Sequence, residues 1–202
     1  MYNCLELFSG TKSFGKVVDQ FGWKNTSLDL DNKFEPDINI NILDWDHTEY
    51  PPDTFDIIWA SPPCTEYSKA KSRGVRDIEG ANKIVLKVLE IIKYFNPCLW
   101  IIENPQTSLL KKQPFMIELE KEYFFHDADY CMYGKPYRKR TRFWTNKEHC
   151  ELKLCDKNCG SIINNKHIGS CGNGTKKYTD KSYSVDEKHS IPPDLIFSLL
   201  QE

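Results

Sequence analysis

Short apolar runs that alternate with helical patterns most constrain the fold of this chain. The runs of strand length span residues 3–8, 26–30, 55–60 and 99–102. Between them, residues 14–21 and 82–95 have the apolar spacing of helices that bury one face. This alternation predicts an α/β fold, in which helices cover both faces of a mostly parallel sheet.

Polar side chains follow the points where these predicted strands end. They are Ser9, Gly10 and Thr11 after the first strand, Asp29 at the end of the second, Cys64 after the third and Glu103 after the fourth. The carboxyl ends of parallel strands meet at one edge of a sheet, where such folds bind their ligands. We therefore expect these residues to converge on a single site.

Each of these residues has a plausible chemical use. A glycine turn at Gly10 lets a ligand approach the backbone at a helix N-terminus, and Asp29 is placed to hold ribose hydroxyls. Pro62 and Pro63 stiffen the loop that presents the Cys64 thiol as a nucleophile. A partly desolvated Glu103 suits hydrogen bonding or proton donation. The competing interpretations are a surface aspartate, a core thiol and a solvated glutamate.

A basic segment compensates for the weak overall charge. The formal net charge is −2, so contact with phosphates requires a local basic patch, and residues 133–144 supply one. If Thr141 lies in a strand, Arg140 and Arg142 share a face. Guanidinium groups suit phosphates or a base carbonyl. A solvated basic face is the ordinary alternative.

Four segments, in this order and spacing, resemble the motifs of the cytosine-5 DNA methyltransferase family. They are residues 6–11, Pro62-Pro63-Cys64, Glu103-Asn104-Pro105 and Arg140-Thr141-Arg142, and residues 189–193 more faintly resemble the family's last motif. The resemblance implies a Rossmann-like S-adenosylmethionine-dependent methyltransferase fold. The compact layout is closest to phage and viral members. We expect one domain over residues 1–202, with a final helix at 190–202 that packs back on the core.

The resemblance also implies roles for individual residues. The Cys64 thiolate adds to C6 of a cytosine that has left the base stack, and Glu103 holds the N3 and amine edge. Arg142, helped by Arg140, contacts the base carbonyl. The methyl group passes from S-adenosylmethionine to C5. The residues that match the family's cofactor contacts are Phe8, Ser9, Gly10, Thr11, Asp29, Leu30, Asn41, Ile42 and Pro63.

Several departures from the family pattern leave alternatives open. Lys12 and Ser13 stand where the family has glycines, Thr65 replaces a glutamine and Asn41 an aspartate. The usual target-recognition domain is missing, so a protein partner or a second copy could supply recognition of the DNA.

The first alternative is the same chemistry on RNA, since a tRNA-methylating branch of the family also has a Pro-Pro-Cys motif. The second is a methyltransferase-like module that binds cofactor or nucleic acid without turnover. An amino-methyltransferase is a weaker option, because its Pro-Pro loop presents an aromatic residue where Cys64 stands.

Residues 146–180 predict a loop-rich insert in place of that domain, because they are polar and rich in Lys, Asn, Gly and Cys. Two ligand pairs in this insert favour a zinc site formed by Cys155, Cys159, His167 and Cys171, with Cys150 as a spare ligand. Zinc would staple a segment too short for its own core. The alternative is a flexible loop with reduced thiols.

The chain also lacks the signals of membrane insertion and export. No apolar run approaches the roughly 18 residues of a membrane helix. The segment Met1-Tyr2-Asn3-Cys4 has neither the basic start nor the apolar run of a secretion signal. We therefore expect a soluble, intracellular protein with reduced cysteines and no membrane partner.

Overall fold

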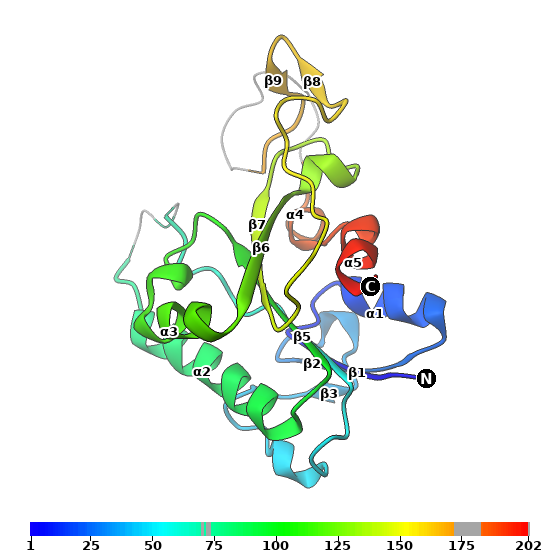
Figure 1. The fold of residues 1–202 in the computed structure, drawn as a ribbon. Coiled ribbons are helices and arrows are strands. Elements are labelled where there is room, and N and C mark those ends of the chain that lie inside the picture. The colour runs from blue at the N-terminus through cyan, green and yellow to red at the C-terminus, as the bar shows by residue number, and fades with distance from the viewer. Residues whose placement is uncertain (70, 72–73, 172–182, 202) are drawn as a thin grey trace.

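A seven-stranded sheet forms the centre of the protein in a computed structural model, which describes residues 1–69, 71, 74–171 and 183–201 (Figure 1). The strand order is β3-β2-β1-β4-β5-β7-β6, in which β7 runs antiparallel to both β5 and β6 and the other pairs are parallel. The strands are β1 (Asn3–Leu7), β2 (Lys24–Asp29), β3 (Ile38–Asn39), β4 (Ile57–Ala60), β5 (Leu99–Pro105), β6 (Phe124–Asp129) and β7 (Arg140–Thr145). The predicted mostly parallel α/β sheet is confirmed.

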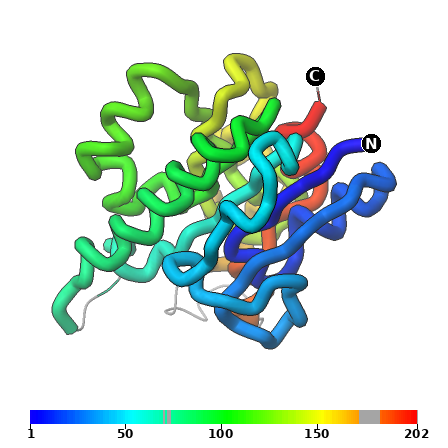
Figure 2. Tube along the Cα trace, turned by 90° about the horizontal axis from the view of Figure 1, so that it is seen from below, coloured from blue at the N-terminus to red at the C-terminus, as the bar shows by residue number. Residues whose placement is uncertain are grey.

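Helices cover both faces of this sheet. The α-helices are α1 (Ser13–Val18), α2 (Ile78–Phe95), α3 (Pro114–Glu122), α4 (Val185–His189) and α5 (Pro193–Leu200). Short 3-10 helices are η1 (Asp19–Phe21), η2 (Asn32–Phe34), η3 (His47–Glu49), η4 (Leu110–Lys112) and η5 (Tyr130–Tyr133). Figure 2 shows α2 on one side of the sheet and α1 on the other.

The two sides bury separate apolar clusters, because side chains alternate along each strand. Leu5, Ile58 and Ile102 pack in the cluster that contains α2, whereas Ile57 and Ile101 pack in the cluster that contains α1 and α5. The central strands β4 and β5 are therefore apolar on both faces, as a doubly covered sheet requires.

Glu6 explains how α1 begins without a conventional N-cap. Lys12, at the N-cap position, makes no side-chain capping bond. Instead, the buried carboxylate of Glu6 accepts hydrogen bonds from the backbone N–H groups of Phe14 and Gly15, both at 3.1 Å. A Cβ on Gly15 would lie 2.6 Å from Asn25 Nδ2 and 2.9 Å from this carboxylate, so a larger residue would displace the side chains that hold the helix start. The strand thereby fixes the helix at the sheet edge where the first predicted loop lies.

Two element boundaries differ from the expectation. Helix α2 starts at Ile78, before the apolar pattern at residue 82, because the Asp77 side chain caps it by accepting the Gly80 N–H at 2.8 Å. Strand β5 continues through Glu103 to Pro105, because β7 pairs with it there. Glu103 therefore sits within a strand and not in a loop.

The end of the chain packs beside its beginning. Leu195 and Leu199 of α5 are buried in the same cluster as α1, and the Phe197 and Phe21 rings lie 5.2 Å apart. The Ser13 hydroxyl accepts the Ile191 N–H at 3.1 Å. In the predicted C-terminal segment 190–202, only residue 202 lies outside the described residues.

The predicted insert is described as far as residue 171, and residues 172–180 lie outside the described part. It contains the hairpin of β8 (Ile162–Ile163) and β9 (Lys166–His167), which projects beyond the sheet in Figure 1. Among the described residues, no helix combines the length and apolar character needed to cross a membrane.

Candidate active site

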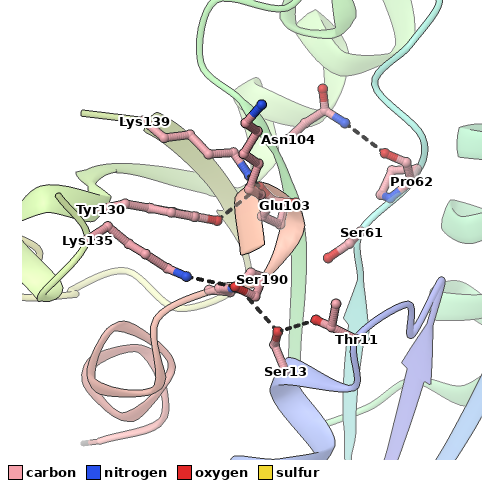
Figure 3. A network of polar contacts seen from close by, with 12 residues as sticks. Thr11, Ser13, Ser61, Pro62, Glu103, Asn104, Tyr130, Lys135, Lys139 and Ser190 are labelled. Atoms are coloured by element: carbon pink, nitrogen blue, oxygen red, sulfur yellow. Dashed lines mark hydrogen bonds and ion pairs between the residues drawn. The ribbon is translucent and has the colours of Figure 1, made fainter. Parts of the chain in front are cut away.

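The loop after β4 presents Cys64 at the carboxyl edge of the sheet. Pro62 is buried, Pro63 is exposed and Cys64 is half-buried. The Asn104 amide, on the neighbouring strand β5, donates a hydrogen bond to the Pro62 carbonyl at 3.0 Å (Figure 3). This bond ties the loop to β5. The Cys64 thiol is therefore held at the site and is more exposed than the buried Cys4.

Glu103 extends from β5 into a nearly closed environment, with 7% of its surface exposed. The Tyr130 hydroxyl donates to Glu103 Oε1 at 3.4 Å, and Lys139 Nζ lies 4.0 Å from the same oxygen (Figure 3). Burial raises the pKa of Tyr130 well above its usual value, and the Glu103 charge raises it further. The phenol therefore stays protonated and acts as a donor to Glu103.

Opposing charges act on the Cys64 thiol. Burial raises the pKa of Cys64, the Glu103 charge adds to this effect, and the Lys139 charge opposes it. Lys139 Nζ also lies 4.7 Å from the centre of the Tyr130 ring and donates to the Lys188 carbonyl at 3.2 Å. Lys139, which sequence reasoning did not find, is thus the cation whose charge favours the Cys64 thiolate against the larger effect of burial.

Arg140 and Arg142 lie on one face of β7, as their spacing predicts, but the structure does not bring them to Glu103. In the β5–β7 pairing, Glu103 is opposite Phe143 and Asn104 is opposite Arg142, so the two arginines face the other side of the sheet. Arg142 donates to Asp127 at 2.8 Å and to Glu120 at 3.2 Å, and it stacks 3.7 Å from the Phe125 ring centre.

Arg140 holds a buried carboxylate. Asp129 is fully buried and accepts bonds from Arg140 Nε at 3.0 Å, Arg140 Nη2 at 2.6 Å, Arg138 Nε at 3.2 Å and the Cys155 N–H at 2.8 Å. Burial alone would raise the pKa of Asp129, but the hydrogen bonds from Arg140, Cys155 and Arg138 outweigh it and lower this pKa. Arg140 therefore stabilises the ends of β6 and β7.

Arg140→Ala should mainly reduce stability. Removing the bidentate Arg140 side chain leaves the buried Asp129 carboxylate without two of its hydrogen bonds. We therefore expect the free energy of unfolding to fall by about 2–3 kcal/mol. Urea denaturation measures this loss. Arg138→Ala is the matched control: its side chain is 43% exposed and it makes one bond to Asp129, so its loss should be under about 1 kcal/mol. Equal losses in the two variants would contradict this assignment.

The glycine turn after β1 and the end of β2 frame a cavity of about 350 Å³. Gly10 has a φ of +43°, which favours glycine, and its N–H donates to Asp29 Oδ2 at 2.8 Å. The Ser9 hydroxyl is buried and has no hydrogen-bond partner within the described residues. The cavity lining includes Gly10, Thr11, Asp29, Phe34, Asp186 and His189.

The other predicted cofactor residues are not among those that line the cavity. Leu30 is exposed, Ile42 is buried in the core, and the Asn41 side chain accepts the Leu43 N–H at 3.1 Å. Phe8 is partly buried with a φ of +58°, and Pro63 is exposed.

His189 lies at the cavity and is close enough to Glu103 to be affected by its charge, and it was not among the predicted site residues. Burial lowers the pKa of His189, the Lys139 charge lowers it further and the Glu103 charge raises it. His189 also lines the cavity beside Asp29. The signal available in the sequence was the faint resemblance of residues 189–193 to the family's last motif.

A second cluster joins three of the four predicted zinc ligands. Cys155, Cys159 and His167 lie together with Cys131, which was not predicted. The remaining predicted ligand, Cys171, is exposed, and its thiol donates to the Arg138 carbonyl at 3.6 Å.

A parallel sheet with a Cys–Glu–Lys group at its carboxyl edge beside a glycine-turn cavity has the arrangement of a methyltransferase. A model of the C-5 cytosine-specific DNA methylase family matches residues 3–125. The probable DNA (cytosine-5)-methyltransferase of Frog virus 3 is 33% identical over 222 residues, with 97% of each chain covered. The chain therefore belongs to the C-5 cytosine-specific DNA methylase family.

Solved structures share the fold at low identity. The EhMeth methyltransferase of Entamoeba histolytica superposes with a TM-score of 0.56 at 18% identity, covering 77% of this chain and 56% of that one. A putative DNA modification methyltransferase from an E. coli prophage superposes with a TM-score of 0.54 at 14% identity, and the match covers 72% of this chain and 46% of that one. The Dnmt2 methyltransferase of S. pombe superposes with a TM-score of 0.54 at 15% identity, and the match covers 78% of this chain and 57% of that one. This chain thus matches about half the length of each.

These relationships confirm the predicted family, the Rossmann-like methyltransferase fold and the enzyme class. The main functional prediction, cytosine-5 methylation of DNA, is the activity that defines the family. Use of S-adenosylmethionine is expected for it. The match of nearly full length to the viral relative fits the predicted compact layout.

Proposed function

We propose that this protein methylates C5 of cytosine in DNA through a covalent bond between Cys64 and the base. The observation that carries this proposal is the convergence of Cys64, Glu103 and Lys139 at one sheet edge. A simple binding module has no need of a strand-end thiol between a carboxylate and a cation. The family model and the viral relative support DNA as the substrate.

The reaction follows from the charges at this edge. The Cys64 thiolate, stabilised by Lys139, forms a bond to C6 of the extruded cytosine, which makes C5 nucleophilic. Glu103, oriented by the Tyr130 hydroxyl, binds the N3 and amine edge of the base. After C5 accepts a methyl group, a water molecule takes the C5 proton, and the electron pair of that C–H bond restores the C5–C6 double bond and expels the Cys64 thiolate.

The cavity beside Gly10 fits a nucleoside cofactor. Each oxygen of Asp29 accepts one backbone N–H, from Gly10 and from Asp31, and each retains a lone pair for a ribose hydroxyl. The unpaired Ser9 hydroxyl offers a further polar contact. S-adenosylmethionine, bound there, supplies the electrophilic methyl group. Gly10, Thr11 and Asp29, which line this cavity, would hold the cofactor at the sheet edge that carries Cys64.

The substrate phosphates have a candidate cationic surface near the Cys64 loop. Burial lowers the pKa of Lys111, and the charges of Arg142, Lys69 and Lys112 lower it further, so these cations are close enough to repel one another. Lys69 follows the Cys64 loop and Lys111 and Lys112 lie in η4. Such a cluster suits a phosphate backbone. Sequence selection then falls to the insert, a second copy or a protein partner.

Transfer of a labelled methyl group tests the proposal and its RNA alternative together. The full chain is incubated with S-adenosylmethionine that carries a deuterated methyl group and with duplex DNA, single-stranded DNA or tRNA. Mass spectrometry of the digested nucleosides locates the label. Labelled 5-methyldeoxycytidine supports the proposal, whereas label in tRNA alone overturns it in favour of the RNA reading. No product on any substrate, from protein shown to bind the cofactor, favours the binding module.

Lys139→Met should shift the pH dependence of Cys64. Because the Lys139 charge lowers the pKa of the Cys64 thiol, loss of Lys139 raises that pKa. Alkylation of Cys64 should then become fast only at a higher pH than in wild type. Alkylation of Cys64 by iodoacetamide, followed by peptide mass spectrometry across a pH series, measures the shift. Lys135→Met is the control, since Lys135 instead donates to Ser190 Oγ and the Glu187 carbonyl. Identical profiles for Lys139→Met and wild type would refute the role of Lys139.

A further inference from the structure

Four metal-binding side chains converge away from the methyl-transfer site. The sulfur atoms of Cys131, Cys155 and Cys159 and a ring nitrogen of His167 all lie within 4.8 Å of one another. Bond lengths to zinc of about 2.3 Å for sulfur and 2.0 Å for nitrogen put the ligand atoms of a tetrahedral site about 3.5–3.8 Å apart. A small contraction of the cluster therefore gives that geometry.

The backbone around these ligands is shaped to bring them together. Cys131 lies in η5, immediately after β6, while Cys155 and Cys159 lie in the loop that follows β7. His167 ends the β8–β9 hairpin, whose turn residues Asn164 and Asn165 have φ values of 49° and 63°. Two consecutive positive φ angles are typical of a tight hairpin turn. This turn returns the chain so that His167 Nε2 lies 3.5 Å from Cys155 Sγ.

The described part of the insert, which ends at residue 171, has no apolar core that could hold this arrangement. Over residues 151–171, Cys155 is the only buried residue. A short polar segment that gathers three thiols and an imidazole is typical of a metal-stapled structure.

We propose that Cys131, Cys155, Cys159 and His167 bind one zinc ion in a closed, structural site. Four protein ligands leave no open position for a substrate, which distinguishes this site from a catalytic zinc centre. Cys131 replaces the sequence-predicted Cys171, whose thiol contacts a backbone carbonyl elsewhere. The proposal is independent of methyl transfer.

The zinc would fasten the insert to the framework of the active site. Cys131 directly follows Tyr130, whose hydroxyl donates to Glu103. On the other side of Tyr130, Asp129 accepts the Cys155 N–H at 2.8 Å. The metal and this bond therefore hold the insert at both neighbours of Tyr130.

Metal analysis of three full-length proteins tests the site. Wild type, Cys159→Ser and Cys171→Ser are purified with reductant, supplied with zinc and dialysed, and zinc is measured by plasma mass spectrometry. We expect about one zinc per chain in wild type and in Cys171→Ser, and its loss in Cys159→Ser. Cobalt substitution should give thiolate-to-cobalt absorption with the same pattern. A wild type that takes up no zinc, or equal loss in both variants, would overturn the proposal.

A measurement on wild type alone covers the case in which Cys159→Ser does not fold. Zinc-loaded and chelator-treated wild type are alkylated, and each cysteine is followed by peptide mass spectrometry. Zinc should protect Cys131, Cys155 and Cys159 while Cys171 reacts equally in both samples. A disulfide among the three protected cysteines, in protein kept reduced and supplied with zinc, would refute the site.

Discussion

Cys64→Ser is expected to lower the rate of methyl transfer at least about a thousandfold, because a serine hydroxyl is a far weaker nucleophile than a thiolate at neutral pH. The half-buried side chain loses only one polarisable atom, so the fold and the cofactor cavity should be retained. Single-turnover kinetics measure the chemical step, while calorimetric titration with S-adenosylmethionine checks that cofactor binding persists.

The matched control is Cys98→Ser, which changes an exposed thiol that bonds to the Asp56 carbonyl. It should turn over at the wild-type rate. DNA containing 5-fluorocytosine adds a direct test: fluorine cannot leave as a proton, so the Cys64–base bond persists. Wild type should form a covalent complex that maps to Cys64, and Cys64→Ser should form none. Methyl transfer by Cys64→Ser at the wild-type rate would disprove the nucleophile.

Glu103→Gln should slow methyl transfer by about 10²–10⁴-fold while making Cys64 a more reactive thiol. Glutamine keeps the shape and an acceptor for the Tyr130 hydroxyl, but it removes the charge that binds the protonated edge of the base. The same charge raises the pKa of Cys64, so its removal lowers that pKa. In Glu103→Gln, the single-turnover rate of methyl transfer should therefore fall, while the alkylation of Cys64 at a given pH should become faster.

Glu120→Gln provides the control for this pair of measurements. Glu120 bonds to Arg142 and Trp144 on the other face of the sheet, so its neutralisation should leave the Cys64 alkylation profile unchanged. A general loss of structure in Glu103→Gln would also slow methyl transfer and expose the half-buried Cys64 to alkylation, so the melting temperature of the variant must match that of wild type. Faster alkylation combined with wild-type methyl transfer would show that Glu103 does not act on the base.

Much of this site could be predicted because it depends on strand ends, which apolar patterns reveal locally. Cys64 and Glu103 each follow a continuous apolar run, and parallel pairing brings them to one edge. The pairing partner of Glu103 could not be predicted in the same way. The β6–β7 hairpin sets which residues of β7 share its face, and that register depends on tertiary contacts.

The zinc ligands show the same limit at longer range. Cys155, Cys159 and His167 are close in sequence and could be grouped by spacing. Cys131 precedes β7 in the sequence, whereas the other three ligands follow it, and the antiparallel packing of β6 and β7 brings Cys131 beside them. Spacing rules favour local ligands such as Cys171 and do not find ligands that the fold brings together.

Side chains along β7 point alternately to the two faces of the sheet, so mutations at odd and even positions should have different effects. Thr141 and Phe143 share the face of Glu103, whereas Arg140 and Arg142 support carboxylates on the opposite face. When the residues of β7 are substituted one at a time, the effects of the substitutions should therefore alternate from each position to the next. Changes on either face would lower the abundance of folded protein, because Thr141, Phe143 and Trp144 are all buried, but only changes on the Glu103 face should also alter the turnover of the protein that folds.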